Sequence, residues 1–333
     1  MNESGKPHGC ERRRVVTIRK FREFETYADA VRDADLQMTL PRLQRPQWEI
    51  HAFAVADFHL QFGCEGGGNL MEGTARSDGT FLYLPLAGLQ RANGTPMRRE
   101  SILVVAPGCD FTISVLEEHQ WCSIYVPTSV IARNIVYDAP CYASFAGACV
   151  VELEADEIAE LRARLTRLRR TVGAAPELPP DRGSGRWMRR QLKTVCRKLL
   201  AADTSCGAST GRPPLVRSEL ARILRDQIAC RGAEDLTIED LATAADVSQR
   251  TLRTFFLEYF GVPPSRYLTI RRLNQVRSAL RKGDPDETTV TAVAARFGFW
   301  HLGRFAGAYA KLFGEAPSDT LHAVGRRAAA ECV

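Results

Sequence analysis

Hydrophobic residues change their spacing along the chain, and the change separates strands from helices. Between Trp48 and Val126, apolar and polar residues are interleaved in short runs, which is typical of β-strands. From Glu154 onward, apolar residues recur every three or four positions, which is typical of amphipathic helices. The pattern therefore predicts an α+β chain in which the strands precede the helices.

Turn signals divide the first stretch into short strands. Asn93-Gly94 is a strong hairpin signal, Pro107-Gly108 predicts a second turn, and the glycine-rich run Gly63–Gly68 is expected to be a loop. A short helix is expected within Phe21–Ala34. The predicted strands are Trp48–Leu60, Phe81–Pro85, Ile102–Ala106, Phe111–Val115 and Trp121–Val126. Short strands at this spacing favour an antiparallel barrel or jelly roll.

A helical seam follows the strands. Its apolar residues are spaced by three, four, three and four positions, and they are Ile158, Leu161, Leu165, Leu168 and Val172. Such a seam packs against another helix or against a sheet. Two interpretations stay open: the helix covers the barrel of its own chain, or it pairs with a second copy as a dimerisation helix.

The last part of the chain contains one small unit twice, at Thr237–Gly261 and at Thr289–Gly314. Each copy predicts a short helix, a turn and a second helix. In the first copy Thr237 and Ser248 are placed as N-caps. The second copy has one additional residue after the turn. A helix over Pro264–Lys282 joins the copies, with a buried side that consists of Ile270, Leu273, Val276 and Leu280.

A short helix followed by a turn and a second helix with an arginine-bearing face is the pattern of a helix-turn-helix. One copy is weak support, because any helical bundle contains paired helices, but two copies joined by a helix are far more specific. On the second helix of the first copy, the expected DNA contacts are Ser248, Gln249, Arg250, Thr251, Arg253 and Thr254. On the joining helix, Arg271 and Arg272 are expected to act through phosphates or the local field.

Charge supports this assignment by its position more than by its total. The net charge of the 333-residue chain is only +6. From Arg250 to Lys282, however, there are eight Lys or Arg residues and one acid, Glu258. A run of this kind is usually a solvated face, but here it lies where phosphate contacts would be needed.

The repeated segment resembles the DNA-binding domain of the AraC/XylS family of transcription regulators. The resemblance rests on Ser248-x-Arg-x-Leu252-x-x-x-Phe256, Phe260-Gly261-x-x-Pro264, Gly298-Phe299 and Phe313-Gly314-x-x-Pro317. It implies two helix-turn-helix units reading adjacent major grooves, and a cupin-like barrel before them that senses a ligand. Within the family, the segment Gly298–Leu321 resembles the branch that includes ethanolamine-utilisation regulators.

The second unit departs from the family's pattern. Where the family often has arginine or another polar residue, this chain has Gly303, Ala306 and Gly307. The residues of this unit that are expected to reach DNA are His301, Arg304 and Lys311. We therefore expect the second unit to contribute affinity more than discrimination.

Length and composition favour a chain of two domains. The expected divisions are a disordered tail over 1–14, a sensory domain over 15–150, a helical dimerisation segment and linker over 151–205, and a DNA-binding domain over 213–322. The boundary is expected at Ala201–Pro214, which is rich in small residues and proline. Ten cysteines without a CxxC pair, no signal peptide and no membrane-spanning run predict reduced thiols in the cytoplasm.

Catalysis is not expected. The histidines of the strand region, His51, His59 and His119, form no HxH pair of the kind that holds a metal in many cupins. The run Gly66-Gly67-Gly68 lacks the lysine of a phosphate-binding loop. The chain is therefore expected to need neither a metal nor a cofactor, and a barrel enzyme fused to a DNA-binding domain is disfavoured.

These observations predict a sequence-specific, DNA-binding transcription regulator. It is expected to be an activator that responds to a small-molecule effector, forms a homodimer and contacts RNA polymerase. A constitutive DNA-binding regulator whose barrel binds a protein partner is the alternative. The sequence identifies neither the effector nor the operator.

Overall fold

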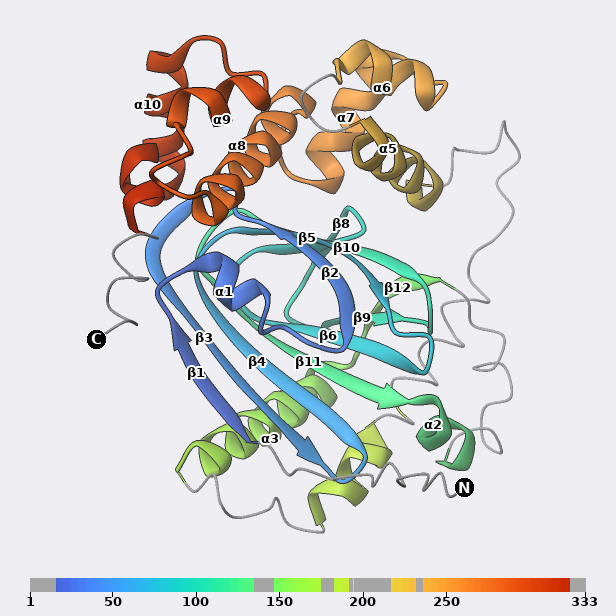
Figure 1. Cartoon of the computed structure of the whole chain (residues 1–333). Coiled ribbons are helices and arrows are strands. Elements are labelled where there is room, and N and C mark those ends of the chain that lie inside the picture. The colour runs from blue at the N-terminus through green and yellow to red at the C-terminus, as the bar shows by residue number, and fades with distance from the viewer. Residues whose placement is uncertain are drawn as a thin grey trace, which may run out of the picture.

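The structure, a computed structural model, describes residues 16–134, 147–174, 183–191, 194, 217–231 and 236–323. Its strands form two antiparallel sheets, and most of its helices lie in one layer at one end of them (Figure 1). The predicted order, strands first and helices second, is confirmed. The expected tail over 1–14 and the expected boundary at Ala201–Pro214 lie outside the described residues.

The strands of the two sheets are all antiparallel to their neighbours. The seven-stranded sheet has the order β1 (Thr17–Phe21), β3 (Leu43–Val55), β4 (Phe58–Gly67), β11 (His119–Pro127), β6 (Gly79–Ala87), β9 (Ser101–Val105) and β12 (Ala148–Glu152). The five-stranded sheet has the order β2 (Ala34–Thr39), β5 (Asn69–Ala75), β10 (Asp110–Val115), β7 (Gln90–Ala92) and β8 (Thr95–Met97). We call these strands together the sheet domain.

Aromatic side chains fill the space between the two sheets. Phe81 of β6 stacks on Phe111 of β10 with ring centroids 4.9 Å apart, and Tyr83 stacks on Trp121 at 5.9 Å. Since successive side chains of a strand point to opposite faces, their neighbours Leu82 and Cys122 lie on the other face of the seven-stranded sheet. Both faces of this sheet are therefore buried.

The glycine-rich run does not form the expected loop. Gly63, Gly66 and Gly67 lie within β4, and β4 pairs along its length with β3 and β11. A Cβ at Gly63 would lie 2.2 Å from the Trp121 indole, and one at Gly66 would lie 2.2 Å from the Arg45 carbonyl oxygen. Close packing against ring and backbone atoms, and not a turn, accounts for glycine at these positions.

The other turn predictions are confirmed. Asn93 and Gly94 connect β7 to β8 with φ angles of 48° and 77°, the left-handed conformation that a two-residue hairpin requires. Gly108 turns the chain between β9 and β10 with φ 70°. The helix expected within Phe21–Ala34 is short: α1 spans Phe24–Ala28.

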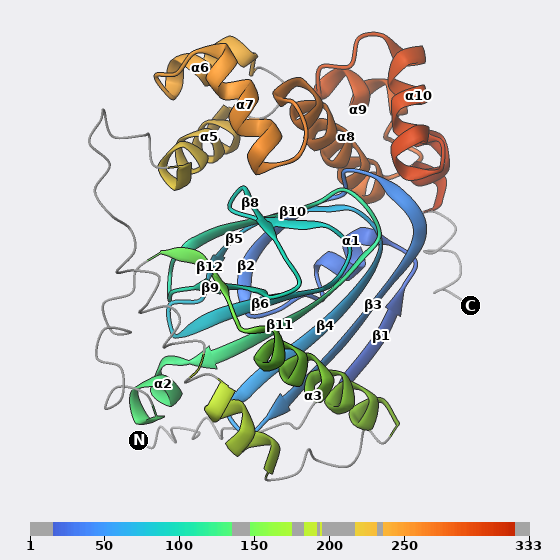
Figure 2. The same cartoon turned by 180° about the vertical axis from the view of Figure 1, so that it is seen from behind.

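The helical seam packs on its own chain. Helix α3 (Ala155–Ala174) lies against the outer face of the seven-stranded sheet, across the strands from the helices that follow residue 217 (Figure 2). Leu161 and Leu165 are 2% and 0% exposed, in one core with Phe62, Leu82 and Ile124. Of the two interpretations of the seam, the structure therefore favours packing on its own chain and contradicts the dimerisation surface predicted for Ile158, Leu161, Leu165, Leu168 and Val172. Four of these side chains are buried in a core with strands of the same chain, and Leu168 is half-buried against it.

The remaining helices include a short α2 (Thr128–Asn134) after β11. The helical domain consists of α5 (Arg217–Arg231), α6 (Ile238–Ala244), α7 (Gln249–Tyr259), α8 (Pro264–Lys282), α9 (Val290–Arg296) and α10 (Leu302–Phe313). Helix α8 runs between the pair α6–α7 and the pair α9–α10, as the repeated sequence unit predicts (Figure 1).

Local caps account for where these helices begin. The Thr237 hydroxyl accepts a hydrogen bond from the Asp240 amide at 3.1 Å, and the Thr237 amide donates to the Asp240 carboxylate at 2.9 Å. The Ser248 hydroxyl accepts from the Thr251 amide at 3.0 Å, and Thr289 caps α9 in the same way. The predicted N-caps are confirmed, and each satisfies a backbone donor that a helix start leaves unpaired.

Candidate nucleic-acid interface

Helix α7 divides into a buried face and an exposed face. Leu252 and Phe256 are 0% exposed and pack in a core with α5, α6 and the start of α8. The opposite face, which we call the outer face of α7, contains the six side chains predicted to contact DNA, all of them exposed: Ser248, Gln249, Arg250, Thr251, Arg253 and Thr254. Among the described residues, neither Arg250 nor Arg253 forms an ion pair, so both guanidinium groups are available to a partner.

The sheet domain contacts the other end of α7. The Ser114 hydroxyl donates to the Tyr259 carbonyl oxygen at 2.9 Å, and the Arg91 guanidinium donates to the Glu258 carbonyl oxygen at 3.1 Å. These carbonyls belong to the last turn of the helix, where intrahelical partners are missing. Burial raises the pKa of Tyr259 to about 12, so its hydroxyl stays protonated and donates to the Asn93 side chain at 3.3 Å. The sheet domain therefore fixes the carboxy-terminal end of α7 and leaves its amino-terminal end free.

Arg271 is not available to DNA. It is 5% exposed, and its guanidinium donates to the Glu72 carboxylate on β5 at 2.7 Å and to the Gln37 side chain on β2 at 2.9 Å. Burial alone would lower the pKa of Arg271, but Tyr267 and Glu72 outweigh it and raise this pKa, so the residue stays charged. The structure contradicts the phosphate contact expected of Arg271, because α8 turns this side chain toward the sheet domain. An effect of its charge through the local field stays a prediction.

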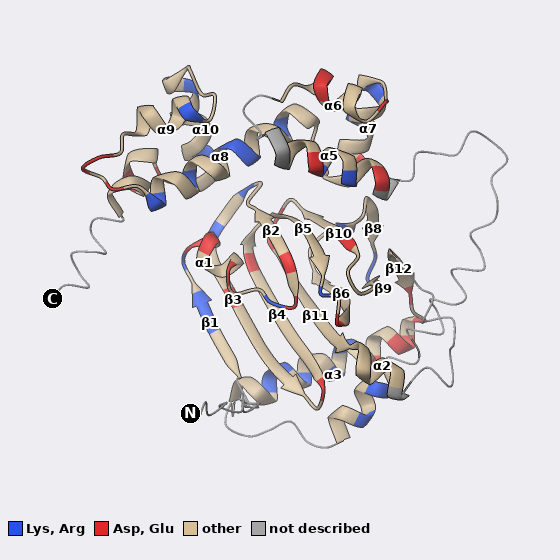
Figure 3. Ribbon diagram, turned by 45° about the vertical axis from the view of Figure 1, so that its right-hand side comes forward, with Lys and Arg blue, Asp and Glu red and all other residues tan. Residues whose placement is uncertain are grey.

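Two other arginines of α8 also face the sheet domain. Arg277 forms ion pairs with Glu25 at 2.7 Å and with Glu315 at 2.9 Å, and Arg281 pairs with Glu23 and Glu25. Figure 3 shows basic residues along α8 and acidic residues at α1, which lies beside it. Part of the basic run that suggested a DNA surface is therefore used to hold the two domains together.

Arg272 has a different environment from its neighbour. It is half-buried, and its guanidinium lies 5.3 Å from the centroid of the Phe299 ring, at the turn between α9 and α10. The side chain thus connects α8 to the second helix pair. Its expected phosphate contact stays a prediction.

The second helix pair also has an exposed face and a buried face. His301, Arg304 and Lys311 are exposed, as expected, and Phe305 and Tyr309 face the core at 3% and 0% exposure. Sequence reasoning did not single out Trp300, which precedes α10 and is 77% exposed. The sequence feature that could have identified this position is the additional residue of the second copy, and this residue is Trp300.

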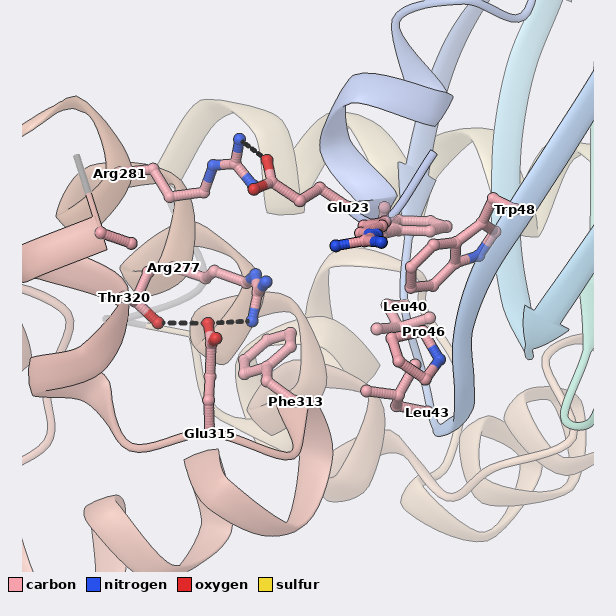
Figure 4. Close-up of a pocket in the computed structure, with 13 residues that line it drawn as sticks. Glu23, Leu40, Leu43, Pro46, Trp48, Arg277, Arg281, Phe313, Glu315 and Thr320 are labelled. Carbon is pink, nitrogen blue, oxygen red and sulfur yellow. Dashed lines mark hydrogen bonds and ion pairs between the residues drawn. The ribbon is translucent and has the colours of Figure 1, made fainter. Parts of the chain in front are cut away.

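A pocket lies between the two domains (Figure 4). Its volume is about 340 Å³, and its walls come from β3 and the segments next to α1 on one side and from α8, α10 and the segment after α10 on the other. The apolar part is formed by Phe24, Leu40, Leu43, Trp48 and Phe313. The charged part is formed by Arg277, Arg281, Glu23 and Glu315. Such a pocket can hold a small amphipathic molecule.

Two further features concern the described residues only. No group of three or more His, Cys, Asp or Glu side chains there is placed to hold a metal ion. No helix in the same ranges is long and apolar enough to cross a membrane.

Comparison with known proteins supports the assignment of the last part of the chain. Residues 241–323 match the family of the helix-turn-helix domain. The probable thc operon regulatory protein of Rhodococcus erythropolis is 35% identical over 126 residues, which are 38% of this chain and 38% of that protein. The XylDLEGF operon transcriptional activator 2 of Pseudomonas putida is 43% identical over 86 residues, which are 26% of this chain and 55% of that protein.

The crystal structure of the AraC-like transcriptional activator CuxR aligns with 80% of this chain and 96% of its own at 12% identity, with a TM-score of 0.40. The matches to the two operon regulators span 38% and 55% of their lengths. The names of these two proteins are those of regulators and not of enzymes. Residues 241–323 therefore match a helix-turn-helix domain, and the chain is similar in part of its length to two operon regulators.

Proposed function

We propose that this chain is a sequence-specific transcription regulator of the AraC/XylS type that places α7 in the major groove of DNA. One observation carries the proposal. The six side chains of the outer face of α7 are exposed inside the segment that matches a helix-turn-helix domain, and its two arginines have no ion-pair partner among the described residues. Arginine can make a bidentate contact to guanine in the major groove.

The pairs α6–α7 and α9–α10 act in this proposal as two helix-turn-helix units joined by α8. Their equivalent features support it. Thr237 and Thr289 cap the first helices, and Asp246 and Gly298 both have left-handed backbones, with φ 50° and 75°, in the turns. The sheet domain is a cupin-like jelly roll in the same proposal, supported by its two packed antiparallel sheets.

The sheet domain senses a small molecule, and the pocket between the domains is the proposed place. A ligand there would touch Trp48 of β3 and Arg277 of α8 at once. It would therefore bind one arrangement of the two domains more tightly than another, and such a difference is what a regulatory ligand requires. The relatives named as operon activators favour activation, which implies contact with RNA polymerase. A homodimer, if formed, uses a surface other than the α3 seam.

Selection of DNA by the full chain tests this function. Duplexes are enriched from a random pool over repeated rounds of binding and then sequenced. The proposal predicts a recurring motif, and footprinting of a duplex that carries it should show two adjacent protected segments on one face of the helix. Enrichment without any recurring motif would contradict sequence-specific binding.

A further inference from the structure

The two helix pairs differ by one residue, and its position is defined by the backbone. Asp246 and Gly298, the left-handed residues of the two turns, are equivalent, and the N-caps Ser248 and His301 are equivalent. In the first pair, one residue lies between the left-handed residue and the N-cap. In the second pair, two residues lie between them. The additional residue of the second pair is Trp300, the neighbour of Phe299.

Trp300 is exposed in a way that the fold does not require. Phe299 packs its ring 5.1 Å from Phe305 and so anchors the turn to the core. The indole of Trp300 points away and is 77% exposed, and Leu302 beside it is 42% exposed. Among the described residues, no aromatic ring or cation packs on this indole. Together these two side chains offer a partner outside the chain a small apolar contact surface at the start of α10.

Beyond this indole, the exposed face of α10 has few projecting side chains. Position by position, Arg250, Arg253 and Thr254 of α7 are replaced by Gly303, Ala306 and Gly307. A Cβ at Gly303 or Gly307 would meet nothing within 4 Å, and neither residue has a left-handed backbone. Internal packing therefore does not demand glycine, although glycine weakens a helix relative to alanine.

Charge decides what kind of partner this surface fits. Helices α9 and α10 contain Arg296, Arg304 and Lys311 and no Asp or Glu. All three cations are exposed. A polyanion with apolar groups in a groove is complementary to such a surface, and the DNA major groove, lined by phosphates, presents the C5-methyl group of thymine there.

We propose that Trp300, together with Leu302, contacts thymine methyl groups and that the second unit selects its half-site through these apolar contacts. Because Gly303 and Gly307 have no side chains, the backbone of α10 can approach the bases closely enough for the indole to reach them. This inference rests on the proposed DNA-binding function. It assigns discrimination to a unit that the sequence predicted would contribute mainly affinity.

Replacing thymine by deoxyuridine tests the inference, because it removes only the methyl group. The full chain first selects a duplex from a random pool, and each thymine of that duplex is then replaced in turn. Binding is measured by fluorescence anisotropy for the unaltered chain, Trp300→Ala and the control Leu89→Ala, whose replaced side chain is 82% exposed on the sheet domain. We expect one or two replacements in the second half-site to weaken binding of the unaltered chain about three- to fivefold.

Trp300→Ala should weaken binding to the thymine duplex by a similar factor and should no longer distinguish thymine from deoxyuridine at those positions. Leu89→Ala should behave as the unaltered chain does. If Trp300→Ala binds every duplex normally, the inference is wrong. Normal DNA binding with lost activation in a reporter assay would assign the indole to a protein partner instead. If the chain selects no motif at all, the proposed function itself has failed, and the inference falls with it.

A second pair of variants tests the close approach of α10 to DNA and leaves Trp300 unchanged. Gly307→Ala adds one methyl group, whereas Gly307→Leu adds a side chain that extends into solvent, because residue 307 is exposed and nothing lies within 4 Å of a Cβ placed there. Both should fold and melt no lower than the unaltered chain. We expect Gly307→Leu to lose at least tenfold in affinity for the selected duplex and Gly307→Ala to lose much less. Equal affinity of a stably folded Gly307→Leu would overturn the close approach of α10 to DNA.

Discussion

Arg271 of α8 and Glu72 of β5 form a buried ion pair that joins the helical domain to the sheet domain, with 2.7 Å between nitrogen and oxygen. The same Glu72 oxygen accepts a hydrogen bond from the Tyr267 hydroxyl at 2.7 Å. Each of the two charged side chains is 6% exposed. The helix that joins the two helix pairs is therefore attached to the sheet domain. Any movement between the domains must either break this ion pair or keep both of its residues together.

Removing one partner of this pair should destabilise the chain more than removing both. Arg271→Met leaves the Glu72 carboxylate buried without its cation, and Glu72→Met leaves the Arg271 cation buried without its anion. Each single variant is expected to lose about 3 kcal/mol in the free energy of unfolding, and the double variant less than either single variant. Urea unfolding followed by fluorescence measures these values, and strict additivity would show that the pair is not energetically coupled.

Arg271→Met should also leave the salt dependence of DNA binding unchanged. A lysine or arginine that contacts a phosphate contributes about one unit to the slope of log affinity against log salt. Because Arg271 is held by Glu72, no such loss is expected when it is replaced. A slope reduced by about one unit would mean that Arg271 leaves Glu72 and contacts DNA in the complex.

Substitution in the α3 seam should affect folding and not association. Leu165 is 0% exposed in the core formed with the sheet, so Leu165→Ala is expected to cost about 2–5 kcal/mol in the free energy of unfolding. The oligomeric state in analytical ultracentrifugation should equal that of the unaltered chain. A folded Leu165→Ala variant that changes from dimer to monomer would restore the seam as a dimer interface.

One ion pair of the sheet domain should make stability depend on pH. The hydrogen bond that the His59 ring donates to the Asp33 carboxylate raises the pKa of His59, whose side chain is 52% exposed, with 3.3 Å between the two groups. Because this pKa is higher in the fold than in the unfolded chain, the stabilisation is complete below about pH 6.5 and is lost as pH rises through the folded pKa. Solvent screening limits it to less than about 1 kcal/mol.

The measurement compares the unaltered chain with His59→Asn. The unaltered chain should lose slightly more stability than the variant between pH 5.5 and pH 8 in urea unfolding. An equal loss in both chains would show that the Asp33 contact contributes nothing.

The local structure of the helical domain could be predicted because its signals are local. Pro263-Pro264 and Gly283 bound α8 at both ends, and Thr237 and Ser248 cap helices with groups only three residues away. The environment of Arg271 could not be predicted in this way. Its partner Glu72 is 199 positions distant, and α8 is buried on two sides, against other helices and against the sheets.

The α3 seam and the glycine run are two further cases in which the local sequence does not identify the tertiary contact. Periodicity at Leu161 and Leu165 correctly predicts a buried face, but it carries no information on whether a sheet or a second chain covers it. Glycine at position 63 suggests a turn by composition, whereas the requirement comes from the Trp121 indole across the strand pair. Tertiary neighbours decide both cases, and only the fold reveals them.

The most direct test of the central claim is the affinity of an arginine-pair variant for selected DNA. Arg250→Ala with Arg253→Ala removes two exposed cations of α7, and Arg167→Ala with Arg170→Ala removes two exposed cations at the same spacing on α3, across the sheet domain from α7. The first variant should lose at least about tenfold in affinity for the selected duplex and discriminate less between base substitutions in one half-site. The second should bind as the unaltered chain does. Equal affinity of both variants, or a loss in the first that is the same for every DNA sequence, would contradict base reading by α7.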